Sequence, residues 1–298
     1  MRNLEYLKNL NSAQKEAVIS TDGPILVVAG AGSGKTKVLT SKIAHLIKNK
    51  KAFPNQILAV TFTNKAAKEM QNRVLKILKS EAVGLSWLGT FHSICAKLLR
   101  KHAKAAGLNS NFTILDTDDQ SRLIKNICKS ENIDTKKISP KIIITIIDRW
   151  KNNGWYPDSV IINKKDIYEK IILPIYKIYQ KKLIDLNACD FGDLMLHCVN
   201  ILERNKDICE IYKKNFKYIL VDEYQDTNFI QSKWLNILAQ NNQNICCVGD
   251  DDQSIYSWRG AEIKNFLDFD KVYKNAKVIR LEENYRSTQN ILSVASGL

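Results

Sequence analysis

One stretch of the chain combines the residue types and spacing that bind phosphate. Residues 29–36 read AGAGSGKT and directly follow the apolar run Ile25–Ala29. Glycines let backbone N–H groups turn inward around phosphates, the Lys35 ammonium can reach the β and γ oxygens, and the Thr36 hydroxyl can ligate Mg²⁺. A helical pattern begins at Lys35, and a helix N-terminus favours an anion. This context predicts a nucleoside triphosphate site with Mg²⁺, rather than a glycine-rich turn without chemistry.

A second apolar run ends in two neighbouring acids. Residues 219–228 read ILVDEYQDTN. A strand here would place Asp222 and Glu223 at the carboxyl edge of the sheet, where α/β proteins bind ligands. Asp222 is suited to hold Mg²⁺ through its hydration shell, and Glu223 can take a proton from the attacking water. An Asp-Glu pair alone is more often a solvated helix start, so this interpretation depends on the phosphate loop at the same edge.

Two aromatic residues and an arginine stand close together in the string SIYSWRGA. Tyr256 and Trp258 are two residues apart, so in an extended segment both rings face one way, with Arg259 beside them. Such a ledge suits unpaired bases, because each stacked ring supplies about 1–3 kcal/mol whatever the base. The alternative for any single aromatic here is ordinary core packing.

Apolar runs alternate with amphipathic segments, which is the pattern of an α/β fold with a parallel sheet and helices on both faces. The predicted strands are 25–29, 57–62, 85–88, 218–221, 245–248 and 277–281. The predicted helices are 35–47, 64–78, 91–105 and 229–239. The strand ends therefore bring the phosphate loop and the two acids to one edge.

Between about Gly107 and Asp190 the pattern changes to helical stretches rich in Lys and Ile. Helix N-caps are predicted at Asp116 or Thr117, and a break falls at 152–154, which reads NNG. This segment is interpreted as an inserted, mainly helical subdomain.

Composition limits the function classes. With 298 residues and 45% hydrophobic content, the chain can bury a core. The 45 Lys and Arg against 31 Asp and Glu give a formal charge of +14, which attracts polyanions, nucleic acid first among them. A proteome rich in Lys also makes basic proteins without such a partner, so the motifs must decide.

The remaining composition argues against a membrane or metal-cage protein. The apolar runs 25–29 and 142–147 are too short to span a bilayer, so no membrane partner and a cytoplasmic location are expected. The seven cysteines lack paired C-x-x-C spacing and are predicted to be reduced and mostly buried thiols. The four histidines lack metal-ligand spacing, so no zinc site is expected.

Six strings, taken in order and spacing, resemble the motifs of the superfamily 1A DNA helicases of the UvrD/Rep/PcrA type. They are LNSAQ (10–14), VTFTNKAAKEM (60–70), GTFHS (89–93), VDEYQDTN (221–228), GDDDQSIYSWRGAE (249–262) and LEENYRST (281–288). The resemblance runs nearly end to end and implies a RecA-like P-loop NTPase domain that uses ATP and Mg²⁺.

The resemblance also implies residue roles. Gln14 would hydrogen-bond adenine, Gln253 would sense the γ-phosphate, Tyr285 would lie against the base, and Arg286 would act as an arginine finger. Lys37 stands where the family usually has arginine, which affects a stacking contact and not phosphate binding. Nucleotide-binding residues would be Gln14, Ala29, Gly30, Ala31, Gly32, Ser33, Gly34, Lys35, Thr36, Lys37 and Tyr285. Catalytic residues would be Lys35, Glu223, Gln253 and Arg286, and Mg²⁺ would be held by Thr36 and Asp222.

A DNA track is implied in the same way. By resemblance, Phe62, Asn64, Thr90 and His92 would complete the ledge of Tyr256, Trp258 and Arg259. For Phe62, core packing is the competing interpretation. The partners expected are single-stranded DNA and junctions of single- and double-stranded DNA.

The domain organisation follows from the resemblance. Domain 1A would span 1–106 and 190–280, the helical insert 107–189 would be domain 1B, and 281–298 would begin domain 2A. Family members continue with further motifs and the domains 2A and 2B, so we expect a truncated cleft that binds ATP weakly and hydrolyses it poorly.

The function implied is the ATP-binding part of a 3′-to-5′ DNA helicase in replication, repair or recombination. One alternative is the motor part of a helicase–nuclease, which shares these motifs. An alternative of another class is a non-catalytic DNA-binding fragment. A general P-loop switch protein fits least, because it would not need the aromatic ledge.

Overall fold

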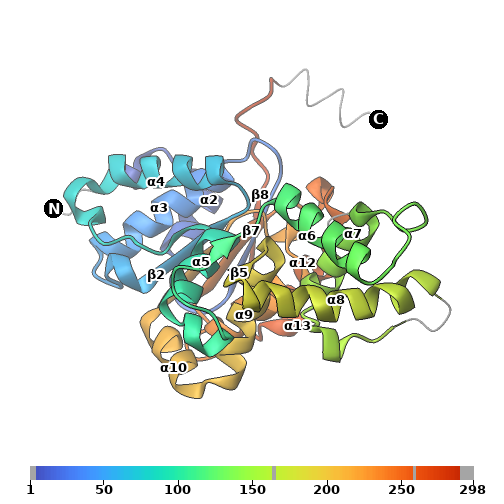
Figure 1. Ribbon diagram of the computed structural model, residues 1–298. Helices are drawn as coiled ribbons and strands as arrows, with labels where there is room; N and C mark the ends of the chain where they lie inside the picture. Colours follow the sequence, from blue (N-terminus) through green and yellow to red (C-terminus); the bar gives the residue numbers. More distant parts are fainter. Residues whose placement is uncertain (1–4, 163–165, 258–259, 289–298) are drawn as a thin grey trace. The chain divides into compact units, whose positions relative to one another are not determined.

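The computed structural model describes residues 5–162, 166–257 and 260–288 (Figure 1). By contacts, the chain forms two compact units. The first comprises the described residues of Met1–Ile94, Glu210–Thr227 and Leu235–Leu298. The second comprises Cys95–Cys209 and Asn228–Trp234. Assigning these units to domains 1A and 1B stays a proposal.

The first unit is built on a six-stranded sheet in the order β3-β2-β6-β7-β1-β8, with all neighbouring strands parallel. Its strands are β1 (Ile25–Ala29), β2 (Ile57–Thr61), β3 (Leu88–Thr90), β6 (Tyr218–Val221), β7 (Ile245–Gly249) and β8 (Lys277–Leu281). Its helices include α1 (Glu5–Lys8), α2 (Ser12–Ile19), α3 (Lys35–Lys48), α4 (Asn64–Leu78), α12 (Lys264–Leu267) and α13 (Phe269–Val272). The predicted α/β fold with a parallel, RecA-like sheet is confirmed.

The second unit is mainly helical. Its helices are α6 (Thr117–Ser130), α7 (Pro140–Asn152), α8 (Ile167–Asp185) and α9 (Phe191–Arg204). Three helices have residues in both units: α5 (Phe91–Lys101), α10 (Lys206–Asn215) and α11 (Phe229–Ala239). A short parallel pair, β4 (Thr113–Ile114) with β5 (Ala188–Cys189), also lies in the second unit and was not predicted.

Two predicted elements differ from the structure by more than one residue at an end. The strand expected at 85–88 is found at Leu88–Thr90, because a turn at Gly84, with a φ of 92°, delays the extended backbone. The helix expected at 91–105 ends at Lys101 and is followed by a separate 3-10 turn, Ala103–Ala106, that ends at Gly107. Positive-φ glycines stop regular structure in both places.

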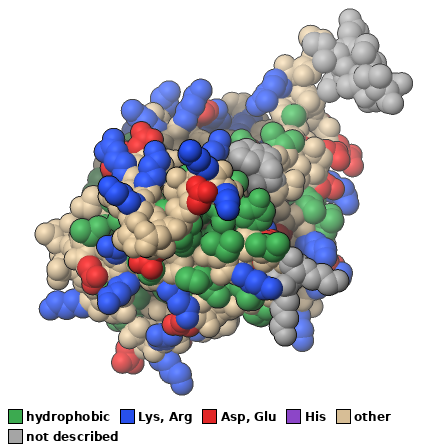
Figure 2. All heavy atoms as spheres, turned by 45° about the vertical axis from the view of Figure 1, so that its right-hand side comes forward, with side chains coloured by type: hydrophobic (Ala, Val, Ile, Leu, Met, Phe, Trp, Pro, Cys, Tyr) green, Lys and Arg blue, Asp and Glu red, His purple; other side chains and the backbone are tan. Residues whose placement is uncertain are grey.

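The face that Figure 2 displays carries both charged and hydrophobic side chains. Lys and Arg side chains are spread over this face, with acidic side chains among them.

Within the described parts of the chain, every helix is too short or too polar to cross a bilayer. All seven cysteines are buried and none forms a disulfide, as predicted.

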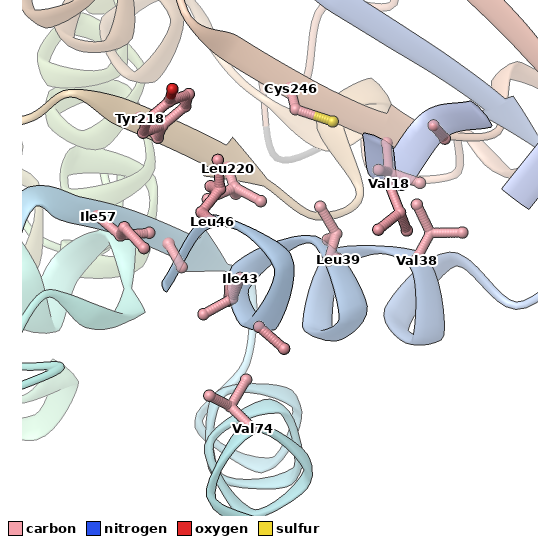
Figure 3. Close-up of a cluster of buried hydrophobic side chains, with 14 of the residues drawn as sticks. Val18, Val38, Leu39, Ile43, Leu46, Ile57, Val74, Tyr218, Leu220 and Cys246 are labelled. Atoms are coloured by element: carbon pink, nitrogen blue, oxygen red, sulfur yellow. The ribbon is translucent and has the colours of Figure 1, made fainter. Parts of the chain in front are cut away.

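The core of the first unit lies between the sheet and helices α2, α3 and α4. Alternate strand residues point into it, as the two-residue period of a strand requires. Figure 3 shows Leu220 of β6 facing Leu46 of α3, with Val74 of α4 below Ile43. Residues at the intervening strand positions, such as Leu58 and Val221, point to the opposite face of the sheet and are buried as well. This is expected for a parallel sheet that is covered on both faces.

The second unit contains a buried ionic cluster. The Lys151 ammonium lies 2.6 Å from Asp190 Oδ2 and 2.8 Å from Asp193 Oδ1, and all three side chains are at most 1% exposed. The Tyr179 hydroxyl donates to Asp190 and the Gln180 amide donates to Asp193. The cluster joins α7, α8 and α9. One ammonium faces two carboxylates, and burial together with the Asp193 charge raises the pKa of Asp190.

Candidate functional site

The phosphate loop connects β1 to α3 with the geometry that the sequence predicted. Gly32 and Gly34 have φ values of 76° and 92°, which side chains other than glycine rarely adopt. The Ser33 N–H and hydroxyl both donate to the Gly30 carbonyl, at 3.2 and 2.7 Å. The loop is therefore a tight turn that ends at the first turn of α3.

Lys35 contacts groups at three strand ends. Its ammonium donates to the Ala29 carbonyl at 3.2 Å and to Gln253 Oε1 at 3.5 Å, and it lies 3.7 Å from Glu223 Oε2. The Lys35 side chain is only 11% exposed. The structure thus brings together three of the residues predicted to act on the nucleotide.

Asp222 follows β6 and is 4% exposed. Burial, and then the nearby Glu223 charge, raises the pKa of Asp222 to about 7, although Lys35 opposes this shift. Its Oδ1 has no hydrogen-bond partner among the described residues. A buried carboxylate with a free oxygen fits Mg²⁺ or a Mg²⁺-bound water, since a dication would favour the charged form.

The other predicted Mg²⁺ ligand, Thr36, lies in the first turn of α3 and is half-buried. The described residues contain no cluster of three His, Cys, Asp or Glu side chains able to hold a metal alone. Mg²⁺ at nucleotide sites is usually bound by one or two protein oxygens together with phosphates and water.

Gln225, which the sequence reasoning missed, links the loops after β6 and β7. Its Nε2 donates to Glu223 Oε2 at 3.0 Å, and its Oε1 accepts from the Asp250 N–H at 3.1 Å. The Asp250 carboxylate in turn accepts from the Gln253 amide. Hydrogen bonds and the Lys35 contacts therefore close a ring through Glu223, Gln225, Asp250 and Gln253.

Two local features constrain this ring. Glu223 has a φ of 51°, a left-handed conformation that is uncommon for a residue with a side chain. A Cβ at Gly249 would lie 2.4 Å from Gln225 Oε1, so a larger residue there would displace the Gln225 side chain. Asp226 is a further missed acid: burial and Glu223 raise its pKa to about 6.

The residues predicted to contact the base are connected through Asn11. Gln14 is 1% exposed, donates to the Ser33 carbonyl at 2.7 Å and accepts from the Asn11 N–H at 3.2 Å. Asn11 Nδ2 donates to the Tyr285 hydroxyl at 2.9 Å, and that hydroxyl donates to Glu283 at 2.7 Å. The Asn11 and Gln14 pair is a capping box, a signal that the string LNSAQ contains.

The other two nucleotide candidates lie beside these groups. The Lys37 ammonium donates to the Asn9 carbonyl. Arg286 is exposed, and its backbone N–H donates to Asn284 Oδ1 at 2.8 Å. A Cβ at Gly32 would lie 2.6 Å from Arg286 Cβ, so the Arg286 segment packs directly on the phosphate loop.

The predicted DNA track follows the ends of β2 and β3. Phe62 is half-buried, and its ring makes an edge contact with Phe91 at 5.8 Å between centroids. Asn64 is exposed at the start of α4. The buried Thr90 exchanges hydrogen bonds with Ser93, at 2.9 and 3.2 Å.

The remaining members of the track differ in setting. Burial lowers the pKa of the half-buried His92, so its neutral form is favoured. Tyr256 follows β7 and is half-buried. Trp258 and Arg259 lie outside the described residues, so the ledge predicted from all three is not assessed by the structure.

Comparison with known proteins agrees with these features. Residues 10–274 match the family model of the UvrD/REP helicase N-terminal domain. A probable DNA helicase II homolog of Rickettsia conorii is 48% identical over 301 residues, covering 100% of this chain and 46% of the relative. The ATP-dependent DNA helicase PcrA of Staphylococcus epidermidis is 48% identical over 290 residues, covering 97% of this chain and 40% of the relative.

The chain spans less than half the length of the curated relatives that it matches. The family match, however, covers most of this chain and includes the phosphate loop, the acids after β6 and the Gln253 segment. The chain belongs to the UvrD/REP helicase family and contains that family's N-terminal domain.

Proposed function

We propose that this chain is the ATP-binding portion of an ATP-dependent DNA helicase that moves 3′ to 5′ on single-stranded DNA. The observation that carries the proposal is the convergence of Lys35, Glu223 and Gln253 at the carboxyl edge of one sheet. A phosphate loop alone is found in proteins of many functions. Here a candidate general base and a polar side chain also lie next to the loop lysine, and this combination fits transfer of the γ-phosphoryl group to water.

Each residue has a task in the proposed reaction. Lys35 neutralises the β- and γ-phosphate oxygens, and the loop N–H groups hold the phosphate chain. Glu223 accepts a proton from the attacking water. Gln253 senses the γ-phosphate and couples its presence to DNA binding. Bound through Thr36 and Asp222, Mg²⁺ would neutralise charge on the phosphates. Arg286 offsets the charge that develops on the γ-phosphate.

DNA binding is assigned to Phe62, Asn64, Thr90, His92, Tyr256, Trp258 and Arg259. Among the described members, Thr90 ends β3, Phe62, Asn64 and His92 follow β2 or β3, and Tyr256 follows β7, so these five come from the same sheet edge as the candidate ATP site. Stacking of bases on aromatic rings gives little sequence preference, as a motor on DNA requires.

Two variants separate this proposal from a non-catalytic DNA-binding fragment. Lys35→Ala should abolish ATP binding and hydrolysis while leaving single-stranded DNA affinity in the absence of ATP within about twofold, because Lys35 contacts only nucleotide-site groups. Trp258→Ala should weaken DNA binding by about five- to a hundredfold, the loss of one stacked base. A wild-type chain that binds DNA but no ATP would refute the proposal.

The direction of movement needs its own measurement. The protein in its full natural length should unwind duplexes that carry a 3′ single-stranded tail and not those with a 5′ tail. The reverse preference would refute the 3′-to-5′ assignment while leaving the ATP site intact. Robust unwinding by residues 1–298 alone would contradict the expectation that further domains complete the cleft.

A further inference from the structure

Three successive carbonyls of the phosphate loop accept hydrogen bonds from groups outside the loop. The Ala31 carbonyl accepts from Asn284 Nδ2 at 2.7 Å, and the Ser33 carbonyl accepts from Gln14 Nε2 at 2.7 Å. Between them, the Gly32 carbonyl accepts from the Tyr285 N–H at 2.9 Å. The orientation of these peptide groups is thus set by two other segments of the chain.

This arrangement determines where the loop N–H groups point. In a trans peptide the C=O and the following N–H point in opposite directions, and the described residues include no cis peptide. Holding the Ala31 and Ser33 carbonyls outward therefore turns the N–H groups of Gly32 and Gly34 to the other side of the loop. Inward N–H groups are the part of such a loop that binds phosphate.

Asn284 uses both ends of its side chain. Its Nδ2 donates to the phosphate loop, while its Oδ1 accepts from the N–H groups of Arg286 and Ser287 at 2.8 and 2.9 Å. The same side chain thus forms the turn that carries Arg286 and fixes that turn to the loop. A Cβ at Gly32 would lie 2.8 Å from Asn284 Oδ1, which shows how closely the two segments approach.

We propose that Asn284 is a positioning residue that orients the phosphate loop for the diphosphate portion of a bound nucleotide. The inference rests on the proposed ATP site and adds a residue that acts on the phosphate loop through a hydrogen bond to its backbone. An amide is required because the side chain must donate and accept at once, and a carboxylate can only accept.

The test uses a double variant with unchanged formal charge. Glu283→Gln/Asn284→Asp keeps acceptors for the Arg286 and Ser287 N–H groups and for the Tyr285 hydroxyl, but it removes the donor to Ala31. The wild type, which has the same formal charge, is the control, and Glu283→Gln alone measures the effect of the first substitution. Calorimetric titration of the 298-residue chain with ADP, inorganic pyrophosphate and AMP measures the effect.

We expect the double variant to bind ADP and pyrophosphate about three- to tenfold more weakly than the control, the loss of one hydrogen bond that orders the loop. AMP affinity should stay within about twofold, because one phosphate depends less on the whole loop. Hydrogen exchange should become faster in residues 29–36 and stay unchanged in residues 218–221, a response that general destabilisation would not give.

Three outcomes would overturn the inference while leaving the proposed function intact. The double variant could bind ADP and pyrophosphate as the control does, or it could lose AMP affinity equally. Faster exchange in both segments would indicate damage to the whole sheet instead of a local effect. A wild-type chain that binds none of the three compounds would refute the proposed function itself, and this inference with it.

Discussion

The Gln225 amide joins the two loops that carry Glu223 and Gln253, the proposed base and the proposed γ-phosphate sensor. It donates to Glu223 in one loop and accepts from the Asp250 N–H in the other, and Glu223 Oε2 lies 3.7 Å from the Lys35 ammonium. Glu223 is also held in a left-handed conformation. These constraints fix the proposed base before the reaction, which is the condition for efficient proton transfer.

Replacing the proposed base should separate binding from hydrolysis. Glu223→Gln keeps the size and an acceptor for Gln225, so Mg²⁺-ATP affinity should change by less than about threefold, while the hydrolysis rate should fall by about 10²- to 10⁴-fold. Equilibrium binding and steady-state hydrolysis in the full-length protein measure the two effects. The exposed Glu81→Gln is the control, and equal hydrolysis by both variants would exclude Glu223 as the base.

Asp148 should make the stability of the second unit depend on pH. Burial raises the pKa of Asp148 to about 7, with Asp190 and Asp193 adding to the shift and Lys151 opposing it. The unfolded carboxyl has the lower pKa and loses its proton first. Stability is therefore fully present below about pH 4 and declines as the pH rises to about 7.

Asp148→Asn should remove that decline. The neutral amide has no proton to lose, so the difference in free energy of unfolding between about pH 4 and pH 8 should shrink, by at most about 4 kcal/mol. Chemical denaturation at several pH values measures it. Asp158→Asn, at an exposed acid of the same unit, is the control. The same pH dependence in wild type and Asp148→Asn would show that other groups cause it.

The sequence predicted the charged members of the site but not the amides that connect them. Lys35, Asp222 and Glu223 follow from short contiguous strings, since parallel strand ends share one edge. Asn284 and Gln225 act through hydrogen bonds to residues 253 and 25 positions away. Such pairings depend on side-chain geometry across the folded chain, and no local spacing indicates them.

At the scale of elements, strongly patterned segments have the predicted bounds. Strands β1, β6 and β8 and helices α4 and α11 match, because each is a complete apolar or periodic run with a clear stop. The two-residue strands β4 and β5 are too short to show a period. Strand β3 begins later than predicted because a turn at Gly84 precedes it. The apolar residues at 85–88 do not indicate where that turn ends.

The side chain of Asp116 caps the N-terminus of α6. Asp116 Oδ1 accepts from the N–H groups of Asp118 and Asp119, both at 2.9 Å. Asp116→Ala should lower the free energy of unfolding by about 1 kcal/mol, with a range of about 0.5–2. Glu131→Ala, at the other end of the same helix, should have little effect or stabilise slightly. Equal losses at both ends would contradict the capping assignment.

At the scale of the whole molecule, the formal charge of +14 and the family together favour a polyanionic partner. Basic side chains are spread over the face shown in Figure 2 with acidic ones among them, so charge alone does not define a DNA path. The path is proposed instead from residues that follow the strand ends, where stacking adds to charge.

DNA binding should therefore depend on salt. The logarithm of the affinity for oligo-dT should fall linearly with the logarithm of the salt concentration, with a slope of roughly 0.7 for each phosphate neutralised. Fluorescence anisotropy of a labelled oligonucleotide measures the slope. Trp258→Ala should lower the affinity at every salt concentration without changing the slope by more than about 0.3, because stacking releases no counterions. An affinity independent of salt would contradict phosphate contacts.

The nucleotide site at the sheet edge is the feature on which the other proposed activities depend. Titrating the chain with a fluorescent ATP analogue, with and without Mg²⁺, tests that site directly. Saturable binding should be tightened by Mg²⁺, weakened at least about tenfold by Lys35→Ala, and made nearly independent of Mg²⁺ by Asp222→Asn. Equal binding by the wild type and both variants would show that Lys35 and Asp222 do not hold a Mg²⁺-nucleotide, and the proposed ATP site would be wrong.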